Sequence, residues 1–353
     1  MFHLNFRMNF NQTLTHWYSD NKRNLPWRKT NDPYFIWLSE IILQQTRVDQ
    51  GLPYYESFVA SFPTVFELAD ATEEKVLKLW QGLGYYSRAR NLHFTAKHIS
   101  TELNGEFPTT YNELIKLKGV GDYTASAIAS ICFNEPTAVV DGNVYRVLSR
   151  YFGIDTPINS TKGIKEFKSL AQKLLPKHKI GDYNQAIMEF GARQCKPSNP
   201  NCDVCPLNNS CLALACGRIN NLPVKLKKTK ITKKFFNFLV LISKEHRTIL
   251  EQRTKNGIWK NLYQFPLIET AKSISINTLK TNKAFKQILN SSKAKITLYN
   301  GDEIVHKLSH QHLYTKFWIV EVDQLPKKGV PFKNIHDFPV PILIGKFIDE
   351  FNF

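Results

Sequence analysis

Four cysteines gathered within 17 residues limit the folds open to this 353-residue chain more than any other feature. They follow the pattern Cys-x6-Cys-x2-Cys-x5-Cys and are Cys195, Cys202, Cys205 and Cys211. Thiolates at this density are typical ligands of zinc or of iron–sulfur clusters. Structural zinc is usually held by two close pairs, whereas only Cys202 and Cys205 have that spacing here. The spacing therefore favours one 4Fe–4S cluster in the loop 195–211, acting either in redox chemistry or as a clamp on the fold.

The charge of the chain indicates a polyanionic partner. Lysine and arginine outnumber aspartate and glutamate by 47 to 30, which gives a formal net charge of +17. Nucleic acid is the first candidate for such a partner and an anionic membrane surface the second. No run of about 18 apolar residues is present, and the segment 1–10 is too short and too polar for a signal peptide. We therefore expect a cytoplasmic protein (nucleoid-associated if bacterial) that does not insert into a membrane.

The pattern of residues changes about two thirds of the way along the chain. Residues 1–222 show helical spacing, as in the segment 68–80, with short turns that contain glycine or proline. Six of the ten residues 225–234 are lysine, which predicts a basic linker over 223–234. Beyond it, the segments 235–242 and 312–322 are rich in aromatic and β-branched residues, and 282–289 fits a helix. The sequence predicts a helical domain (1–222) followed by an α+β domain (235–353).

A glycine-flanked turn joins two helical segments. Gly119, Val120 and Gly121 lie between them. Two glycines allow a phosphate to approach the backbone, and the amides that begin the second helix favour an anion. The same pattern also fits an ordinary tight turn.

Two carboxylates stand in unusual surroundings. Asp141 follows an apolar segment and precedes a helix, so it could be a helix cap or a site residue. Glu40 stands alone between Leu38 and the pair Ile41–Ile42, where burial would raise the pKa of its carboxyl and suit a general acid.

These features together resemble a known family. The matching motifs are Asn24–Arg28, Trp37–Glu40, Leu43–Thr46, Gly82–Leu92, the hairpin at 117–125, Asp141–Val144 and the four cysteines. They are similar to the MutY family of adenine DNA glycosylases, within the helix-hairpin-helix superfamily that includes endonuclease III. The resemblance covers nearly the whole chain. It implies a mainly α helix-hairpin-helix glycosylase fold of two helical subdomains with a cluster loop, followed by a C-terminal α+β Nudix-like domain.

The resemblance also implies the reaction and the residues that perform it. The expected activity is excision of adenine mispaired with 8-oxoguanine or guanine, by a monomer that acts on double-stranded DNA. Glu40 would protonate the leaving adenine, Asp141 would stabilise the cationic sugar, and Asn143 would support Asp141. Two further sets of residues match family positions: around the flipped adenine these are Trp27, Arg28 and Gln185, and against the duplex they are Gln45, Leu83, Tyr85, Gly119, Val120 and Gly121.

Tyr123 separates this interpretation from the nearest alternative. An endonuclease III-like enzyme, which removes oxidised pyrimidines and nicks the strand, has at this position a lysine whose amine forms an imine with the sugar. Tyrosine cannot form that imine, so Tyr123 favours a monofunctional glycosylase and joins the expected catalytic residues. Another alternative, an iron–sulfur DNA-binding protein without catalysis, leaves Glu40 and Asp141 together unexplained.

The C-terminal part supports the same assignment. Residues 258–266 resemble the Nudix-like domain that the family uses to recognise 8-oxoguanine, and endonuclease III lacks such a domain. No cluster of carboxylates follows Phe265, so hydrolysis of a diphosphate at a magnesium site is rejected. Ser309 and His310 match the lesion-reading loop, while Leu308 stands where the family usually has phenylalanine.

Overall fold

The computed structural model of the chain contains two compact units. Residues 2–226, 231–290 and 292–353 are described, the side chains of residues 2–9 excepted. One unit combines residues 1–70 with 91–227, and the other combines 71–90 with 228–353. Part of the expected linker, residues 227–230, lies outside the described residues, and the first strand, β1, already begins at Thr232. Residues 71–90 therefore lie within the helical part of the sequence but pack with the C-terminal part.

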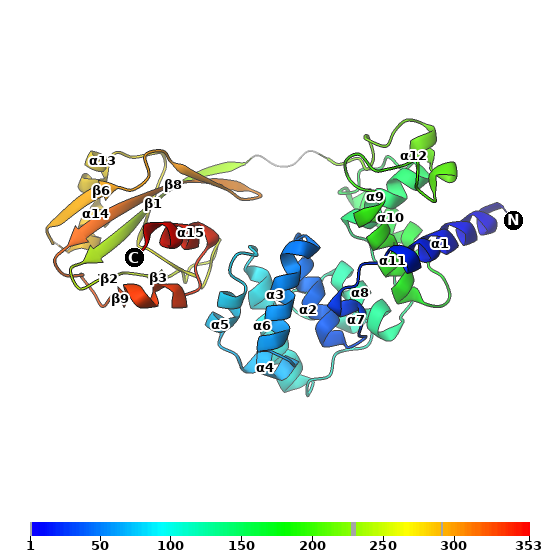
Figure 1. Cartoon of the computed structure of the whole chain (residues 1–353), viewed down its shortest axis with the longest axis horizontal. Helices are drawn as coiled ribbons and strands as arrows, with labels where there is room; N and C mark the ends of the chain where they lie inside the picture. Colours follow the sequence, from blue (N-terminus) through cyan, green and yellow to red (C-terminus); the bar gives the residue numbers. More distant parts are fainter. Residues whose placement is uncertain (1, 227–230, 291) are drawn as a thin grey trace. The chain divides into compact units, whose positions relative to one another are not determined.

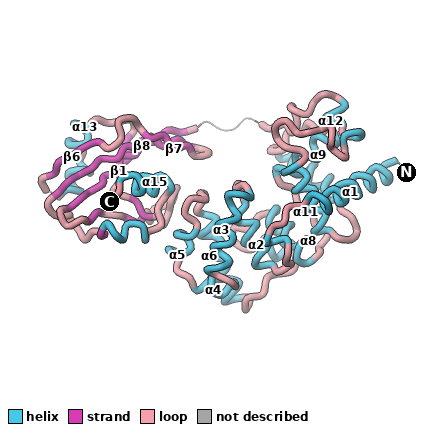
Figure 2. The backbone as a smooth tube through the Cα atoms, viewed as in Figure 1, coloured by secondary structure: helices cyan, strands magenta, loops and turns pink. Residues whose placement is uncertain are grey.

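The first unit is built of helices (Figures 1 and 2). Its elements, with α6 starting in the other unit, are α1 (Phe2–Asn21), η1 (Pro26–Arg28), α2 (Pro33–Leu43), α3 (Val48–Ser61), α4 (Val65–Asp70), α6 (Ser87–Glu102), α7 (Tyr111–Leu114), α8 (Asp122–Phe133), α9 (Gly142–Phe152), α10 (Thr161–Leu174), α11 (Ile180–Arg193), η2 (Asn208–Ser210) and α12 (Leu212–Ala215).

One apolar core joins helices α1, α9, α10 and α11. On α9, Val144, Val147, Leu148 and Tyr151 recur at helical spacing and are all buried. The side chains of three of the four clustered cysteines pack against this same core. The loop that carries them is thus attached to the helix that Asp141 begins.

The helical segment expected over 68–80 is two helices. The first, α4, ends at Asp70, and α5 (Glu73–Leu79) starts afresh after Thr72. The Thr72 hydroxyl accepts a hydrogen bond from the Lys75 amide at 3.2 Å, which caps the new helix. The apolar spacing continued across this break and concealed it.

The second unit is a mixed sheet with helices on both faces (Figure 1). The strand order is β5-β1-β8-β6, with β7 also paired to β8, and β1 runs parallel to β8. The elements after α5 are β1 (Thr232–Ser243), β2 (Arg247–Thr248), β3 (Glu251–Gln252), β4 (Tyr263–Gln264), β5 (Leu267–Thr270), α13 (Ile276–Thr281), α14 (Lys283–Leu289), β6 (Ala294–Leu298), β7 (Ile304–Lys307), β8 (Gln311–Val322), β9 (Val330–Pro331), η3 (Phe332–Asp337) and α15 (Ile342–Phe351).

The two faces of this sheet carry different apolar layers. One face places Leu241 and Val320 in a cluster with residues of α13 and α14. On the other face, the ring of Phe347 from α15 stacks on Phe317 with centroids 4.1 Å apart. The strands expected over 235–242 and 312–322 lie within β1 and β8, and the helix expected over 282–289 is α14.

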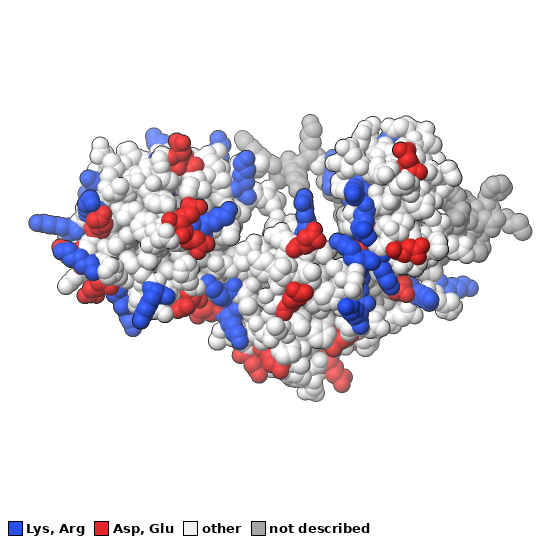
Figure 3. Space-filling view, viewed as in Figure 1, with Lys and Arg blue, Asp and Glu red and all other residues white. Residues whose placement is uncertain are grey.

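Basic side chains lie at many places on the face of the molecule drawn in Figure 3. On the face drawn in Figure 3, lysine and arginine side chains are interspersed with acidic ones. Among the described residues, no helix has the length and apolar character needed to cross a bilayer.

Candidate active site

Glu40 lies in the last turn of α2, a helix buried along most of its length. Asp32 caps this helix by accepting from the Tyr34 amide at 2.8 Å, and Pro33 starts its first turn. Leu38 and Ile42 are fully buried, and the Glu40 side chain between them is partly buried. Burial raises the pKa of the Glu40 carboxyl to about 7, the Asp141 charge raises it too, and Tyr123 and Arg28 act in the opposite direction. The Glu40 carboxyl can therefore hold a proton near neutral pH.

Asp141 is the N-cap of α9. Its Oδ1 accepts from the backbone amides of Asn143 at 2.9 Å and Val144 at 2.8 Å, and its Oδ2 accepts from the Asn143 side-chain amide at 2.6 Å. Burial raises the pKa of the Asp141 carboxyl, while these donors and the Arg146 charge favour its ionised form. Asp141 is thus both the helix cap and the candidate site residue. The capping hydrogen bonds fix the position of the carboxylate whose charge raises the pKa of Glu40.

Tyr123, in the first turn of α8, completes the group. Burial raises the pKa of its phenol well above 10, and the charges of Glu40 and Asp141 raise it further. The phenol therefore keeps its proton and acts as a donor to the Glu40 carboxyl, and it also contacts the Met188 sulfur at 3.6 Å. Three segments far apart in the sequence bring Glu40, Tyr123 and Asp141 together.

Arg28 is held beside this group by a buried carboxylate. Glu189 on α11 accepts from Arg28 at 2.8 Å and from Arg23 at 2.8 and 2.6 Å, and only 1% of its side chain is exposed. Burial acts to raise the pKa of the Glu189 carboxyl, but the two guanidinium groups outweigh it and lower the pKa to about 2. The Arg28 guanidinium also lies over the Tyr18 ring, at 5.4 Å from its centroid.

The other residues expected around the base belong to the same unit. Gln185 on α11 accepts from the Tyr18 hydroxyl at 3.2 Å. The Trp27 side chain is buried and packs edge-on against Tyr55, with centroids 4.9 Å apart. Gln45, which is expected to contact the duplex rather than the base, is exposed in the turn after α2, with a positive φ of 56°.

Glu189 was not predicted from the sequence, although a signal was present. It is a lone carboxylate between Met188 and Phe190, the pattern that singled out Glu40. Met188 and Glu189 follow Gln185 by three and four residues, so all three lie on one face of α11. Arg23 and Tyr18 carried no such signal, because their partners are distant in the sequence.

Arg146 connects Asn143, the residue that supports Asp141, to the cysteine loop. One guanidinium nitrogen donates to the Asn143 side-chain oxygen at 2.8 Å and to the Gly191 carbonyl at 2.6 Å. Another donates to the Cys195 carbonyl at 2.7 Å. The side-chain amide of Asn143 is thereby oriented with its NH2 group toward Asp141. Arg146 is a further functional candidate that the sequence did not reveal.

The four cysteines form one group of possible ligands for a metal cluster. All four are reduced, and the thiols of Cys202, Cys205 and Cys211 each lie near the Cys195 thiol. Burial, and then mutual repulsion, raises the pKa of Cys205 to about 11, which a bound cationic iron centre would reverse. No group of three potential ligands among the described residues is tight enough for a single metal ion. Four thiolates are the usual ligands of a four-iron cluster, so the chemistry of this donor set fits one.

The two glycines of the hairpin differ in backbone conformation and in the space around them. Gly119 has a φ of +82°, and a Cβ there would lie 2.6 Å from the Asn91 Cβ, so glycine is required. Gly121 caps α8 with extended backbone, and a Cβ there would meet no described atom within 4 Å. Val120 is buried between them. The open side at Gly121 leaves the first amides of α8 accessible to an anion.

Four of the residues expected to contact the duplex or the lesion line one cavity of about 430 Å³ in the second unit. Its walls include Leu83 and Tyr85 from the loop before α6, and Leu308, Ser309 and His310 from the loop between β7 and β8. The hydroxyls of Tyr85 and Ser309 are 2.5 Å apart. Residues 224 positions apart in the sequence are thus joined in one site.

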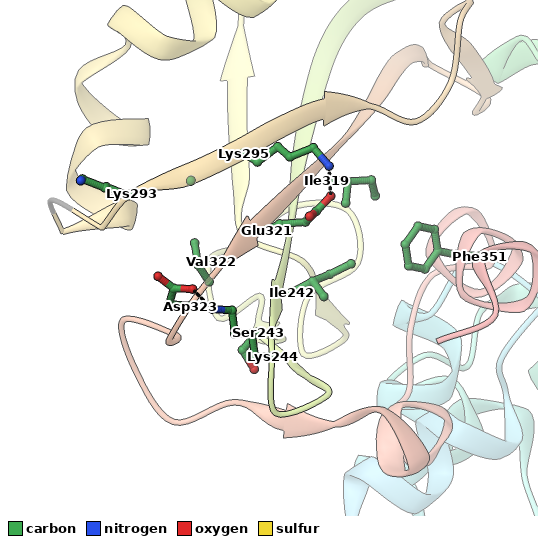
Figure 4. Close-up of a pocket in the computed structure, with 11 residues that line it drawn as sticks. Ile242, Ser243, Lys244, Lys293, Lys295, Ile319, Glu321, Val322, Asp323 and Phe351 are labelled. Atoms are coloured by element: carbon green, nitrogen blue, oxygen red, sulfur yellow. Dashed lines mark hydrogen bonds and ion pairs between the residues drawn. The ribbon is translucent and has the colours of Figure 1, made fainter.

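A larger cavity of about 570 Å³ near one end of β1 and β8 contains none of the predicted site residues (Figure 4). Four of the charged side chains that line it form ion pairs, Lys244 with Asp323 at 2.6 Å and Lys295 with Glu321 at 3.3 Å. It is therefore not the candidate site.

Three family models match the chain. The HhH-GPD superfamily of base excision DNA repair proteins matches residues 38–177, which include Glu40, Tyr123 and Asp141. The iron–sulfur binding domain of endonuclease III matches residues 195–211, from the first clustered cysteine to the last, which bears out the iron–sulfur cluster expected there. A NUDIX domain matches residues 237–350.

Known proteins match over most of the chain. An adenine DNA glycosylase of Buchnera aphidicola subsp. Schizaphis graminum is 36% identical, covering 97% of this chain and 98% of that protein. The adenine DNA glycosylase of Buchnera aphidicola subsp. Baizongia pistaciae is 38% identical, covering 88% of this chain and 86% of that protein. A solved thermostable thymine-DNA glycosylase, 29% identical with a TM-score of 0.55, covers 60% of this chain and 97% of its own. The expected helix-hairpin-helix fold with a NUDIX domain is confirmed, and the chain belongs to the family of adenine DNA glycosylases.

Proposed function

We propose that this chain is a monofunctional glycosylase that excises adenine mispaired with 8-oxoguanine or guanine from double-stranded DNA. One observation supports it above all others: Glu40, whose pKa is raised to about 7, lies beside Asp141, whose ionised form accepts three hydrogen bonds. A carboxyl that holds a proton and a carboxylate that does not are the two groups that cleavage of an N-glycosidic bond needs.

The reaction follows from these two groups. Glu40 donates its proton to N7 of the extruded adenine, and the bond between C1′ and N9 breaks with its electron pair going to the base. Asp141 stabilises the positive charge that develops on the sugar. Water then supplies hydroxide to C1′ and a proton that restores Glu40, which leaves free adenine and an abasic site. Asn143, held by Arg146, keeps Asp141 in place.

Tyr123 supports a reaction that ends at the abasic site. Its phenol cannot form an imine with the sugar, and it serves instead as a donor to Glu40. Two lysines close to this helix are engaged elsewhere: Lys118 lies over the Phe94 ring at 3.9 Å, and Lys168 donates to Asp122 and Ser126.

Arg28, Gln185 and Trp27 are proposed to receive the flipped adenine. The Glu189 carboxylate fixes Arg28, so a polar contact to the base is prepared before DNA binds. When bound, the cluster would stabilise the loop 195–211. Arg146 connects this loop to the site, because it donates both to the Cys195 carbonyl and to the Asn143 side chain.

The second unit is proposed to read the base opposite adenine. Ser309 and His310 are exposed and share a cavity with Tyr85, so polar groups and an aromatic ring can meet one purine there. Leu83 and Tyr85, with Gln45, are proposed to enter the duplex while adenine is extruded. The hairpin Gly119–Gly121 is proposed to bind a phosphate.

Incubation of the protein with four duplexes tests this function. Adenine opposite 8-oxoguanine should be released fastest and adenine opposite guanine more slowly, while an adenine–thymine duplex and one with thymine glycol should stay intact. Alkali should be needed to cut the strand at the abasic site. Strand cutting without alkali would favour the endonuclease III-like alternative, and binding without release of any base would favour a non-catalytic protein.

Two controls sharpen the result. Glu40→Gln should bind the duplex with unchanged affinity and release adenine at least about 100-fold more slowly, because an amide cannot donate the proton efficiently. Ser309→Ala with His310→Ala should reduce the preference for 8-oxoguanine over guanine while excision opposite guanine is retained.

The domain limits and the setting belong to the same proposal. We assign the glycosylase domain to residues 1–222 and the lesion-recognition domain to 235–353, with the basic segment 223–234 as a linker. The protein is proposed to act as a monomer in the cytoplasm, on nucleoid DNA if the cell is bacterial. Size-exclusion chromatography with light scattering checks the first point, since a dimer would elute at twice the 40.8 kDa mass of the chain.

A further inference from the structure

The loop that carries Leu83 and Tyr85 has an unusual backbone. Gly82 and Gly84 have φ values of +105° and +73°, and Tyr85 has +46°. Glycine adopts positive φ readily, but for tyrosine it is a rare conformation. Tyr85 is also 48% exposed, and its hydroxyl bonds to that of the exposed Ser309 at 2.5 Å. That bond holds only the tip of the side chain, so the backbone of the loop needs further contacts.

The guanidinium of Arg88 lies where it can do so. It donates to the carbonyls of Leu83 and Gly84, at 3.4 Å each. Its centre lies over the Trp80 ring at 5.0 Å and over the Tyr85 ring at 5.7 Å. Trp80 is fully buried and donates from its ring nitrogen to the same Gly84 carbonyl at 3.0 Å. Arg88 therefore joins a buried indole to the exposed Tyr85.

Only a guanidinium can make this set of contacts. Its flat face attracts two aromatic rings while its edge donates several hydrogen bonds, whereas an ammonium is a compact, strongly hydrated charge. Burial lowers the pKa of Arg88 to about 10, so it still carries its charge at neutral pH. The cation stays in this half-buried position because carbonyl oxygens and ring faces surround it.

We propose that Arg88 is a positioning residue for base extrusion. It holds the loop 82–86 so that Leu83 and Tyr85 are presented to the duplex before adenine leaves the stack. Without Arg88 the loop would be ordered only during extrusion, and that step would slow. The inference rests on the proposed function, because it assigns this loop the task of entering the duplex.

The test measures extrusion apart from chemistry. In the Glu40→Gln background, a duplex with 2-aminopurine at the target adenine should show a rise in fluorescence when the base unstacks. Arg88→Met should slow that rise at least about tenfold. Arg88→Lys should be nearly as slow, since charge alone does not hold the loop. Lys97→Met, which removes an exposed charge from the same helix α6, should leave the rate within about twofold.

A second measurement separates positioning from general damage. A duplex that already carries an abasic site at the target position needs no base extrusion, so Arg88→Met should bind it within about threefold of the unaltered protein. A normal extrusion rate in Arg88→Met, full rescue by Arg88→Lys, or equal losses of extrusion and abasic-site binding would each overturn the inference. Failure of the unaltered protein to release adenine would instead overturn the proposed function.

Discussion

The pH dependence of adenine release tests the assignment of Glu40 directly. With a pKa of about 7, half of the Glu40 carboxyls carry a proton at pH 7, whereas an ordinary pKa of 4.5 would leave about one in 300 protonated. The environment of Glu40 therefore increases the population of the active acid by about 150-fold at neutral pH. The single-turnover rate constant should be level below about pH 6 and fall tenfold per pH unit above about pH 8.

Tyr123→Phe adds a prediction of direction. The Tyr123 phenol stabilises the ionised form of Glu40, so its loss should raise the pKa of Glu40 and move the midpoint of the profile to higher pH. Tyr145→Phe, the same substitution at a tyrosine that packs against Phe167, should leave the midpoint unchanged. The assay is rapid-quench excision with excess enzyme, in buffers of constant ionic strength.

Three results would refute this reasoning. A rate that rises with pH through 7 would show that Glu40 acts as a base. A midpoint near 4.5 in the unaltered protein would show that burial does not control the acid. A shift to lower pH in Tyr123→Phe would show that the phenol does not favour the ionised carboxyl.

Other expected outcomes concern stability and the cofactor. The raised pKa of Glu40 destabilises the folded protein once the pH exceeds 4.5, and the full cost is present above about pH 7. Glu40→Gln removes this cost, so it should raise the free energy of unfolding by about 2–3 kcal/mol at pH 8 and leave it unchanged at pH 4. Denaturant titrations at the two pH values measure the difference. Glu189→Gln should lower that free energy by about 3 kcal/mol and slow excision at least tenfold, since Arg23 and Arg28 lose a buried carboxylate; unchanged melting and excision would contradict this. The purified protein should hold about four irons per chain with visible charge-transfer absorbance, and Cys205→Ser should lose both; stoichiometric zinc would contradict the cluster.

The sequence revealed those parts of the site that depend on local pattern. The cysteine spacing, the isolated Glu40 and the position of Asp141 before a helix were each visible within a few residues. Glu189 fitted the same kind of pattern but lay outside the motifs that drew attention. Arg23 could not be found, because its partner Glu189 is 166 residues away. Arg146 could not be found either, because two of its partners, Gly191 and Cys195, are more than 40 residues away.

The fold shows the same division between local and distant information. The strands β1 and β8 and the helix α14 follow from composition and period. The start of α5 at Glu73 was hidden by an apolar period that runs through the break. The attachment of residues 71–90 to the second unit leaves no mark in their own sequence, because it depends on contacts with residues after 228.

That attachment has a practical consequence for building chimeras and fragments. Asn261 donates to Glu73 at 2.5 Å, Arg90 donates to the Lys260 carbonyl at 2.9 Å, and the Val340 amide donates to Gln81 at 3.2 Å. A protein truncated after the lysine-rich segment would keep residues 71–90 but lose the partners of those residues. A faithful exchange of the C-terminal module between two relatives would therefore transplant two separate coding segments, 71–90 together with everything after 228, rather than one.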